Sequence, residues 1–517
     1  ILLNDQPDTA KHPKANAISS RTMEHLRRYG ISKAIRASGL SDDHPTDVAY
    51  FTSLDGYEIG RLEQPNRLDA LAAVKSGESP WVSPEPPHRA SQIYLERELK
   101  KLIDSFPSVD VRFGWELMGF EDQGDKVVAI ARDLANNEDV EVQAEYLVGC
   151  EGATGLVRKT LGIGYEGEAG VVREMFGGPM FATYFEATGD LSWLKQKKSW
   201  QYWVVNPEIR ALLIHVDSKN KFVFHFAIHD EKERENADPL KYIYKAAGCE
   251  FPVKILSNVN WTAGFALVAQ KYRQGNVFLA GDSAHLFTPA GGMGMNTGVD
   301  DAVNLGWKLA AVIKGWGFPE LLDSYEAERQ PIGERNVGFA RMFADSMGNV
   351  KVTENIVLDT PEGDAERAEM TPYHSNHAKM EFIIPGVFLG LNYADSPIIS
   401  YDGSSPPPDH HNEYTPNACP GSRAPHVWLE DDALYDRLGP EFTLVDFAGP
   451  SADSSELLKE AENRKVPLSV ITIEDDTVQS LYGNNFVLIR PDQHVAWRSD
   501  DLPENPGALL ERNIGGA

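Results

Sequence analysis

The residues best suited to chemistry lie together at 279–298, where the sequence reads LAGDSAHLFTPAGGMGMNTG. Asp282 follows an apolar run, so we expect its carboxylate at a strand end, where it can accept a hydrogen bond from a sugar-chain hydroxyl. The glycines that follow let backbone N–H groups approach a flat, electron-rich ring closely. A helix that starts after Gly298 would direct the positive end of its dipole at an anionic reduced cofactor.

Each of these residues also has a simpler structural interpretation. A glycine-rich turn before a helix needs no ligand, and a lone Gly-Asp pair favours that interpretation. Here GDSAH, Pro289, four glycines and Asn296 follow one another in a fixed order. The combination therefore indicates a binding loop for a flat redox cofactor.

The loop needs a strand before it and a long helix after it. The run NVFLAGD predicts the strand, and the helix is expected to continue to about residue 316, with Asp300 and Asp301 in its first turn. Apolar spacing and end signals predict further elements along the first 150 residues. These are the end of a buried strand within 1–9, helices at 20–29 and 90–104, and strands at 126–132 and 139–150.

The middle of the chain alternates aromatic and aliphatic residues in short runs such as WQYWVV, ALLIHV and FVFHFAI. This pattern predicts a β-rich domain that binds the substrate. A Pro-rich stretch at 403–423 is interpreted as a linker, and the pair His410-His411 within it as solvated rather than metal-binding.

The last segment, 424–517, predicts a strand, a helix, a strand and then a hairpin, an order that resembles the thioredoxin fold. It contains no cysteine, so dithiol chemistry is excluded and a structural or oligomerisation role is expected.

Bulk composition narrows the function further. The formal net charge of −28 disfavours nucleic acids and anionic membranes as partners. The three cysteines are widely spaced, so neither a metal site nor a disulfide framework is predicted, and a reducing cytoplasm is the expected compartment. No apolar run approaches the roughly 18 residues of a membrane helix.

The segment GNVFLAGDSAHLFTPAGGMGMNTGVDDAVNLGWKLAAVIKGW at 275–316 resembles single-component FAD-dependent aromatic hydroxylases, in particular the phenol and 2,4-dichlorophenol 6-monooxygenase group. PKANAISSRTMEHLRRYGI at 13–31 is similar to that group's segment after the second strand. VLIRPDQHVAWRS at 487–499 looks like part of its cysteine-free, thioredoxin-like tail. The resemblance covers nearly the whole chain.

The resemblance implies a bound FAD, NADH or NADPH as co-substrate, and a phenolic aromatic substrate hydroxylated with O₂ through a flavin C4a-hydroperoxide. It also implies which residues contact the cofactor, with Asp282 on the ribityl chain or pyrophosphate. The other positions are Lys14, Arg21, Gln92, Pro289, Gly292, Gly294, Met295 and Asn296. Surface salt bridges are the alternative for Lys14 and Arg21, and a solvated helix position is the alternative for Gln92.

The run YLVGCEGATGLVRKTLGI at 146–163 resembles the family's second conserved segment. Most members have Asp-Gly where this chain has Glu151-Gly152, so the charge is kept but the side chain is one methylene longer. Arg158 is retained, with a structural ion pair as the alternative to a cofactor contact.

The family opens with a strand and a GxGxxG loop that cradle the FAD pyrophosphate, and this sequence starts at what corresponds to the second strand. Asn4, with Asp5 beside it, stands where members place a ribose-binding glutamate. A parallel sheet without its central strand is not expected to be stable, so we expect the sequence to be an incomplete record of a longer protein.

Residues that orient or ionise the phenol carry no motif. Polar and aromatic side chains on the central strands, with Tyr50, are the candidates, and core packing is the alternative for each. These are Tyr50, Tyr202, Trp203, His215 and His225. His285 lies in the flavin loop and is a further candidate, with support of the site from behind as its alternative. The resemblance implies that Pro289 lines the flavin ring beside the substrate. Two other classes stay open: a flavoprotein of the same fold with different chemistry, and a scaffold that has lost its cofactor. No WxWxIP motif of flavin halogenases is found.

The expected fold is therefore an α/β, Rossmann-like FAD-binding domain with a β-rich substrate domain and a thioredoxin-like domain. The expected ranges are 1–165 with 266–345 for FAD, 166–265 for the substrate, 346–423 for a connecting segment and linker, and 424–517 for the last domain. A homodimer or larger homo-oligomer is expected.

Overall fold

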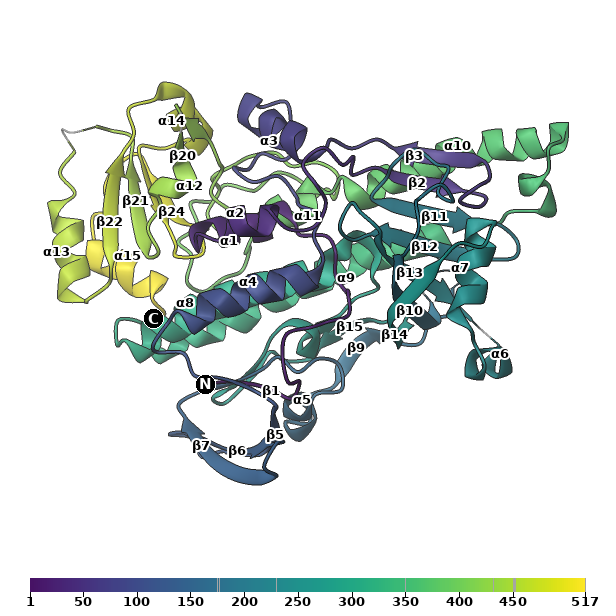
Figure 1. Ribbon diagram of the computed structural model, residues 1–517. Helices are drawn as coiled ribbons and strands as arrows, with labels where there is room; N and C mark the ends of the chain where they lie inside the picture. The colour runs from purple at the N-terminus through teal and green to yellow at the C-terminus, as the bar shows by residue number, and fades with distance from the viewer. Residues whose placement is uncertain are drawn as a thin grey trace.

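A computed structural model gives the fold and describes residues 1–516 except 174, 176, 229, 349, 431, 450 and 451. A seven-stranded sheet lies at one end of the molecule and a four-stranded sheet at the other (Figure 1). The long helices α4 (Gln92–Asp104) and α8 (Met293–Ile313) run through the region between them. Within the described part of the chain, no helix is long and apolar enough to cross a membrane.

The predicted β-rich middle forms the seven-stranded sheet. Its three aromatic runs are adjacent antiparallel strands, as their alternation indicates. Two strands come from residues 48–62, outside the range 166–265 assigned to the substrate domain. In spatial order the strands are β14 (Val253–Ala263), β10 (Gly178–Ala187), β13 (Lys221–Ala227), β12 (Arg210–His215), β11 (Gln201–Val205), β2 (Val48–Phe51) and β3 (Glu58–Leu62).

Side chains alternate between the two faces of this sheet and build two apolar cores. One face carries Tyr50 and Trp203 and packs against Phe382 of α10 (Pro361–Phe382). The opposite face carries Tyr202 and packs against α7 (Pro239–Ala247). The first face is the one that turns toward the glycine-rich loop at 279–298.

The segment 346–423 is more ordered than a connecting segment and linker. It contains the 22-residue helix α10, which begins with Thr360 as its N-cap and Pro361 in the first turn, and the short helix α11 (Pro385–Leu389). The abundance of proline masked these helices in the sequence, because proline favours a helix start as well as a loop. Arg423, at the end of the Pro-rich stretch, is 1% exposed.

Two predicted strands differ in detail. The run 139–150 is divided between β7 (Glu138–Ala144), which pairs with β6 (Val127–Asp133), and β8 (Leu147–Gly149), which pairs parallel with β17 (Val277–Leu279). The strand predicted as buried near the start is β1 (Leu2–Asn4), and Leu2 is 41% exposed.

The helices predicted at 20–29 and 90–104 are confirmed as α1 (Ser20–Arg28) and α4, and Ser19 caps α1 by accepting from the Thr22 amide. The remaining helices are α2 (Ser32–Arg36), α3 (Arg67–Ser76), α5 (Leu156–Thr160), α6 (Glu231–Glu235) and α9 (Asp323–Gly348), with η3 (Pro319–Leu322) and η4 (Glu354–Val357). The remaining strands before the last unit are β4 (Val111–Phe113), β5 (Trp115–Asp122), β9 (Tyr165–Glu168), β15 (Ala266–Ala269), β16 (Arg273–Gln274) and β18 (His285–Leu286).

The last unit has the predicted order of a βαβ unit followed by a hairpin. β21 (Phe442–Asp446) is parallel to β22 (Leu468–Thr472) and antiparallel to β23 (Phe486–Ile489), which pairs with β24 (Val495–Ser499). The other elements of this unit are β19 (Trp428–Leu429), β20 (Asp432–Ala433), α12 (Leu434–Arg437), α13 (Ser455–Asn463), α14 (Asp476–Tyr482) and α15 (Pro506–Asn513).

Buried charges join this unit to the long helices. Arg490, which follows β23, donates to both carboxylate oxygens of Glu328 on α9 at 2.5 and 2.9 Å, and Lys308 on α8 donates to Glu328 at 2.7 Å. All three side chains are 0% exposed. Burial opposes ionisation of Glu328, but Arg490 and Lys308 outweigh it and hold the pKa of that carboxyl well below its ordinary value.

Replacing Arg490 by methionine is expected to lower the free energy of unfolding by about 3–5 kcal/mol, because one partner of a buried ion pair then remains uncompensated. Arg132→Met is the matched control, since Arg132 pairs with Asp139 on the surface and such pairs contribute about 0–1 kcal/mol. Urea unfolding followed by circular dichroism measures both. Equal losses in the two variants would contradict a stabilising role of the buried junction.

Candidate functional site

The loop at 279–298 leads from β17 into α8 through two short helical turns, η1 (Gly281–Ser283) and η2 (Ala290–Gly292). The helix begins at Met293, earlier than the predicted start after Gly298. Gly298 therefore lies inside the helix. A glycine fits this position because the turn at Gly281 approaches it closely: a Cβ on Gly298 would lie 3.2 Å from the Gly281 Cα. The first amides of α8, around Gly294 and Met295, lack intrahelical acceptors and face outward from the helix end.

Asp301 anchors this loop from beneath. Its carboxylate accepts from Arg329 Nε at 2.8 Å, from His285 Nε2 at 2.6 Å and from the Gly281 amide at 3.1 Å. Burial disfavours the charged form, but His285 and Arg329 outweigh burial and keep the pKa of Asp301 below its ordinary value. Because α8 begins at Met293, Asp300 and Asp301 lie well inside the helix and not in its first turn, contrary to the prediction.

His285 serves the same anchor. Its side chain is 0% exposed and its Nε2 bonds Asp301, so it supports the loop from behind. Because it is buried, the His285 side chain is not placed to contact a substrate directly.

Asn296 fastens the loop to the N-terminal segment. Its side-chain oxygen accepts from the Ser19 amide and from Thr22 Oγ1, both at 2.8 Å. Its side-chain nitrogen donates to the carbonyls of Ala17 at 3.0 Å and Gly292 at 2.7 Å. The Asn296 side chain thus bonds other parts of the protein, and its backbone is the part that could contact a ligand.

The segment 146–163 and the adjoining Tyr165 pack against the Gly-Asp-Ser turn at 281–283. The Gly152 amide donates to Ser283 Oγ at 2.9 Å, and Tyr165 Oη donates to the Asp282 carbonyl at 3.1 Å. Arg158 stacks on Tyr165 at 4.0 Å and donates to the Ile163 carbonyl at 2.6 Å. The geometry places Glu151, Arg158 and Asp282 in one neighbourhood, with Arg158 used mainly to hold the backbone.

The exposed Glu151 carboxylate accepts from the Val157 amide at 2.6 Å, at the start of α5. Burial raises the pKa of Asp282, although His285 and Lys14 oppose the shift. Lys14 is therefore within electrostatic reach of Asp282.

Gln92, at the first position of α4, pairs with the backbone of Ala15: its backbone amide donates to the Ala15 carbonyl at 2.7 Å, and its side-chain Oε1 accepts from the Ala15 amide at 3.4 Å. It thereby helps to hold the N-terminal segment, of which Ala17 and Ser19 bond the Asn296 side chain. Asn4 and Asp5 are exposed after β1, and the Asn4 side chain accepts from the Gln6 amide at 2.8 Å.

Arg21 does not join these residues. Its guanidinium is buried and donates to Glu24 at 2.8 Å, to Gln493 Oε1 at 2.7 Å and to the Asp492 carbonyl at 2.6 Å. Glu24 also pairs with Arg423. Arg21 thus connects α1 to the C-terminal unit, and the expected cofactor contact is replaced by a buried ion pair.

Tyr50 and Trp203 lie side by side on the sheet face that turns toward the loop. Their rings stack at 5.7 Å, and Tyr50 also stacks on His374 of α10 at 4.7 Å. Burial raises the pKa of the Tyr50 hydroxyl well above its ordinary value. Tyr202 points to the other face, where its hydroxyl accepts from the Ser199 amide at 2.8 Å.

The two strand histidines are buried and neutral. His215 stacks on Phe222 at 4.4 Å, and burial lowers its pKa to about 3. His225 lies edge-on to Trp261, and burial lowers its pKa to about 4. Both environments resemble packing, the alternative raised for these residues, although His215 also borders a second, smaller hollow.

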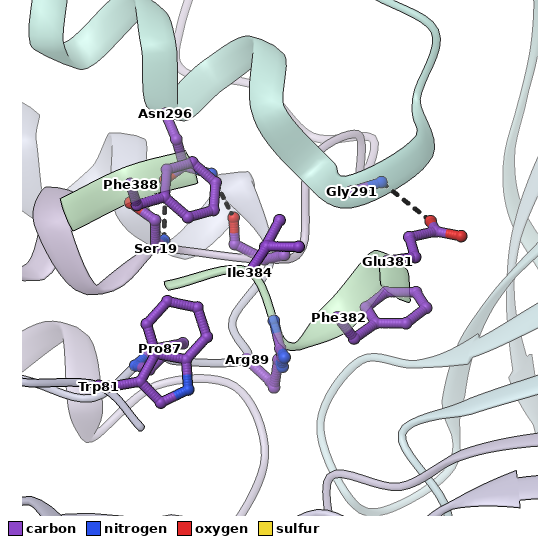
Figure 2. A pocket seen from close by; sticks show the side chains of 11 residues that line it. Ser19, Trp81, Pro87, Arg89, Gly291, Asn296, Glu381, Phe382, Ile384 and Phe388 are labelled. Atoms are coloured by element: carbon purple, nitrogen blue, oxygen red, sulfur yellow. Dashed lines mark hydrogen bonds between the residues drawn. The ribbon is translucent and has the colours of Figure 1, made fainter. Parts of the chain in front are cut away.

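A hollow open to solvent lies beside the loop (Figure 2). Gly291 and Asn296 form one side of it, and Pro289, which is exposed, precedes them. Its apolar walls come from three separate segments, and it also holds one cation and one carboxylate. Besides the two loop residues, its lining includes Ala17, Ser19, Trp81, Pro87, Arg89, Glu381, Phe382, Ile384 and Phe388.

Sequence reasoning missed most of this lining. Trp81 and Arg89 precede α4 in a Pro-rich stretch, and Glu381 and Phe388 lie in the range 346–423, expected to be a connecting segment and linker. None of them belongs to a motif. The density of prolines at 80–89, next to Trp81, was the only signal available.

The site fits a flavin. A side chain at Gly292 would bring its Cβ within 3.1 Å of the Ala17 Cβ, so the glycines keep a narrow passage open between the loop and the N-terminal segment. Helix amides at the start of α8 and the carboxylate of Asp282 supply the polar partners that an isoalloxazine edge and a polyol chain need.

The comparisons agree with this geometry. Residues 1–340 match the family model of an FAD binding domain, and residues 417–517 match that of the aromatic-ring hydroxylase C-terminal domain. The FAD-dependent monooxygenase apdD of Emericella nidulans is 31% identical, over 97% of this chain and 84% of its own. Phenol 2-monooxygenase of a Pseudomonas species is 28% identical, over 99% of this chain and 87% of its own.

Among solved structures, the rebeccamycin biosynthetic enzyme RebC with reduced flavin superposes with a TM-score of 0.88 and 30% identity. The match covers 100% of this chain and 94% of that one. The similarity thus extends over all three parts of the fold.

Replacing Asp301 by asparagine is expected to weaken FAD binding about tenfold or more, a loss of ~1.4 kcal/mol, because Arg329 and His285 lose the charge that holds the loop. Titration of apoprotein with FAD, followed by flavin fluorescence, measures this. Asp323→Asn, which alters an exposed pair with Arg273, is the control. Unchanged affinity in the Asp301 variant would contradict the anchoring role.

Burial lowers the pKa of His374 to about 3, so the folded protein keeps this ring neutral while an unfolded chain protonates it near pH 6.5. Stability is therefore lost as the pH falls from 6.5 toward 3, by about 1.4 kcal/mol per pH unit for each such histidine. His374→Phe keeps the stack on Tyr50. We expect the slope of its unfolding free energy against pH to correspond to the uptake of one proton fewer on unfolding. His410→Phe, at an exposed histidine, should leave the slope unchanged; equal slopes in all three proteins would refute the assignment.

Proposed function

The chain belongs to the family of FAD-dependent aromatic-ring hydroxylases, and from this we propose that it hydroxylates a phenolic substrate, with NADH or NADPH as electron donor. The observation that carries the proposal is the position of the hollow. An aromatic-lined cavity shares Gly291 and Asn296 with the loop that suits the flavin, so substrate and cofactor would meet there.

We propose that Asp282 and the backbone of Gly294, Met295 and Asn296 hold the FAD, with Lys14, Gln92 and Glu151 close by. Bound FAD supplies the activation of dioxygen that side chains lack. The protein must then hold the ring, exclude water and help to ionise the phenol.

Apolar side chains serve the first two tasks. Trp81, Phe382, Ile384 and Phe388 line the hollow from different segments and present apolar surfaces to it, against which a flat aromatic molecule would pack. Figure 2 shows these side chains gathered around the space in front of Gly291. Closely packed aromatic walls also keep bulk water from the reacting atoms.

Glu381 serves the third task. Its carboxylate accepts from the Gly291 amide at 2.9 Å, and His377 Nε2 lies 2.9 Å from its other oxygen. His377 Nδ1 is in turn 3.0 Å from Ser346 Oγ. A phenol with a pKa near 10 needs an acceptor for its proton at neutral pH, and Glu381 is the carboxylate that lines the hollow.

The proposal extends to the compartment and the assembly of the protein. Three unpaired cysteines suit a reducing compartment, so we place the protein in the cytoplasm. The cysteine-free C-terminal unit has no redox chemistry of its own, and we assign it to a homodimer or larger homo-oligomer.

The function is tested by the visible spectrum of the purified protein, followed by NAD(P)H consumption with a panel of phenols. Flavin bands near ~370 and ~450 nm are expected, with consumption stimulated by at least one phenol. A colourless protein that takes up no added FAD would refute the proposal.

Glu381→Gln keeps the hydrogen bond from Gly291 but removes the proton acceptor. We expect product formation to fall at least about tenfold, within the range of general-base effects, while FAD binding is retained. Glu369→Gln on the exposed side of the same helix is the control. A Glu381 variant that forms product at the parental rate would exclude Glu381.

A further inference from the structure

Arg89 is a cation inside the site. It precedes α4 and borders both hollows, the one beside Gly291 and the smaller one beside His215. Its guanidinium lies over the Trp200 ring at 4.1 Å. Its hydrogen bond to a side chain is a long one, to Gln64 Oε1 at 3.4 Å.

No carboxylate of the described residues pairs with Arg89. Arg89 is half-buried, whereas the fully buried arginines have such partners: Arg329 has Asp301, and Arg490 has Glu328. Burial without a neighbouring negative charge lowers the pKa of Arg89 to about 10. A desolvated cation without a counter-ion costs free energy, and an anion that enters the hollow would offset this cost.

The surroundings specify what kind of anion fits. Flat apolar side chains, Trp81 and Phe382 among them, line the same hollow as Arg89, so the ligand must carry an aromatic body beside its negative group. Glu381 repels an anion from the Gly291 side of the hollow. The two charges would therefore orient a ligand, with its acidic group toward Arg89 and its hydroxyl toward Glu381.

Building on the proposed function, we infer that the substrate is an aromatic carboxylic acid with a ring hydroxyl, and that Arg89 binds its carboxylate. The planar guanidinium forms paired hydrogen bonds with a carboxylate, a geometry that neither a neutral amide nor a lysine reproduces fully. Arg89 is thus the residue that selects acids over neutral phenols.

The test uses hydroxybenzoate and hydroxynaphthoate isomers, each beside its neutral amide, with the complete FAD-loaded protein. Dissociation constants from perturbation of the flavin spectrum are expected to favour an acid over its amide at least tenfold. Arg89→Met should abolish this preference, and Arg89→Lys should restore part of it. FAD content and melting temperature should stay at the parental values, as they should in the exposed control Arg97→Met.

The outcomes separate the possibilities. Equal affinity for acid and amide in the parent protein overturns the inference while leaving the hydroxylase intact. Loss of FAD from Arg89→Met with the preference for acids retained assigns Arg89 to the cofactor and also overturns it. If the protein binds no FAD, the proposed function fails; calorimetric titration of the acid–amide pairs then tests Arg89 directly, and equal affinities again reject the inference.

Discussion

Asp301 carries a negative charge in the interior of the protein, and three segments converge on it to compensate that charge. Arg329 reaches it from α9, His285 from the strand after the Gly-Asp-Ser turn, and the Gly281 amide from that turn itself. A buried charge must be paired, so these segments cannot move apart without a large cost. The start of α8 and the turn that carries Asp282 are thereby fixed relative to each other, and this is the geometry on which the proposed cofactor site depends.

The hollow beside that loop is lined by segments that lie far apart in the sequence. The segment before α4 contributes Trp81 and Arg89, and the end of α10 contributes Glu381. Buried charges at the far end of α8 hold the C-terminal unit through Arg490, so the same helix connects the cofactor loop to that unit. The buried cations Arg329, Arg490 and Lys308 each pair with a carboxylate. In the part of the chain that the structure describes, Arg89 has no such partner, and we propose a substrate anion for that role.

Sequence alone identified the cofactor loop, because its glycines and Asp282 are close in the chain and follow one order. Alternation identified the central strands for a similar reason, since period-two patterns are local. The lining of the hollow could not be found this way: Arg89 and Glu381 are separated by almost 300 residues and meet only through the tertiary fold. Arg21 misled because an arginine in a conserved-looking segment gives no indication of its partner. The helix start at Met293 was missed because Gly298, which usually ends a helix, is here required by the close approach of Gly281.

The most direct test of the account is the source of the oxygen atom in the product. The protein, loaded with FAD and supplied with NAD(P)H and an accepted hydroxy-aromatic acid, is allowed to react under ¹⁸O₂, and the product is analysed by mass spectrometry. The account predicts one ¹⁸O atom in the new hydroxyl group, with one NAD(P)H consumed per product formed. Oxygen derived from water, or NAD(P)H oxidation that yields only hydrogen peroxide with every aromatic compound tried, would contradict it.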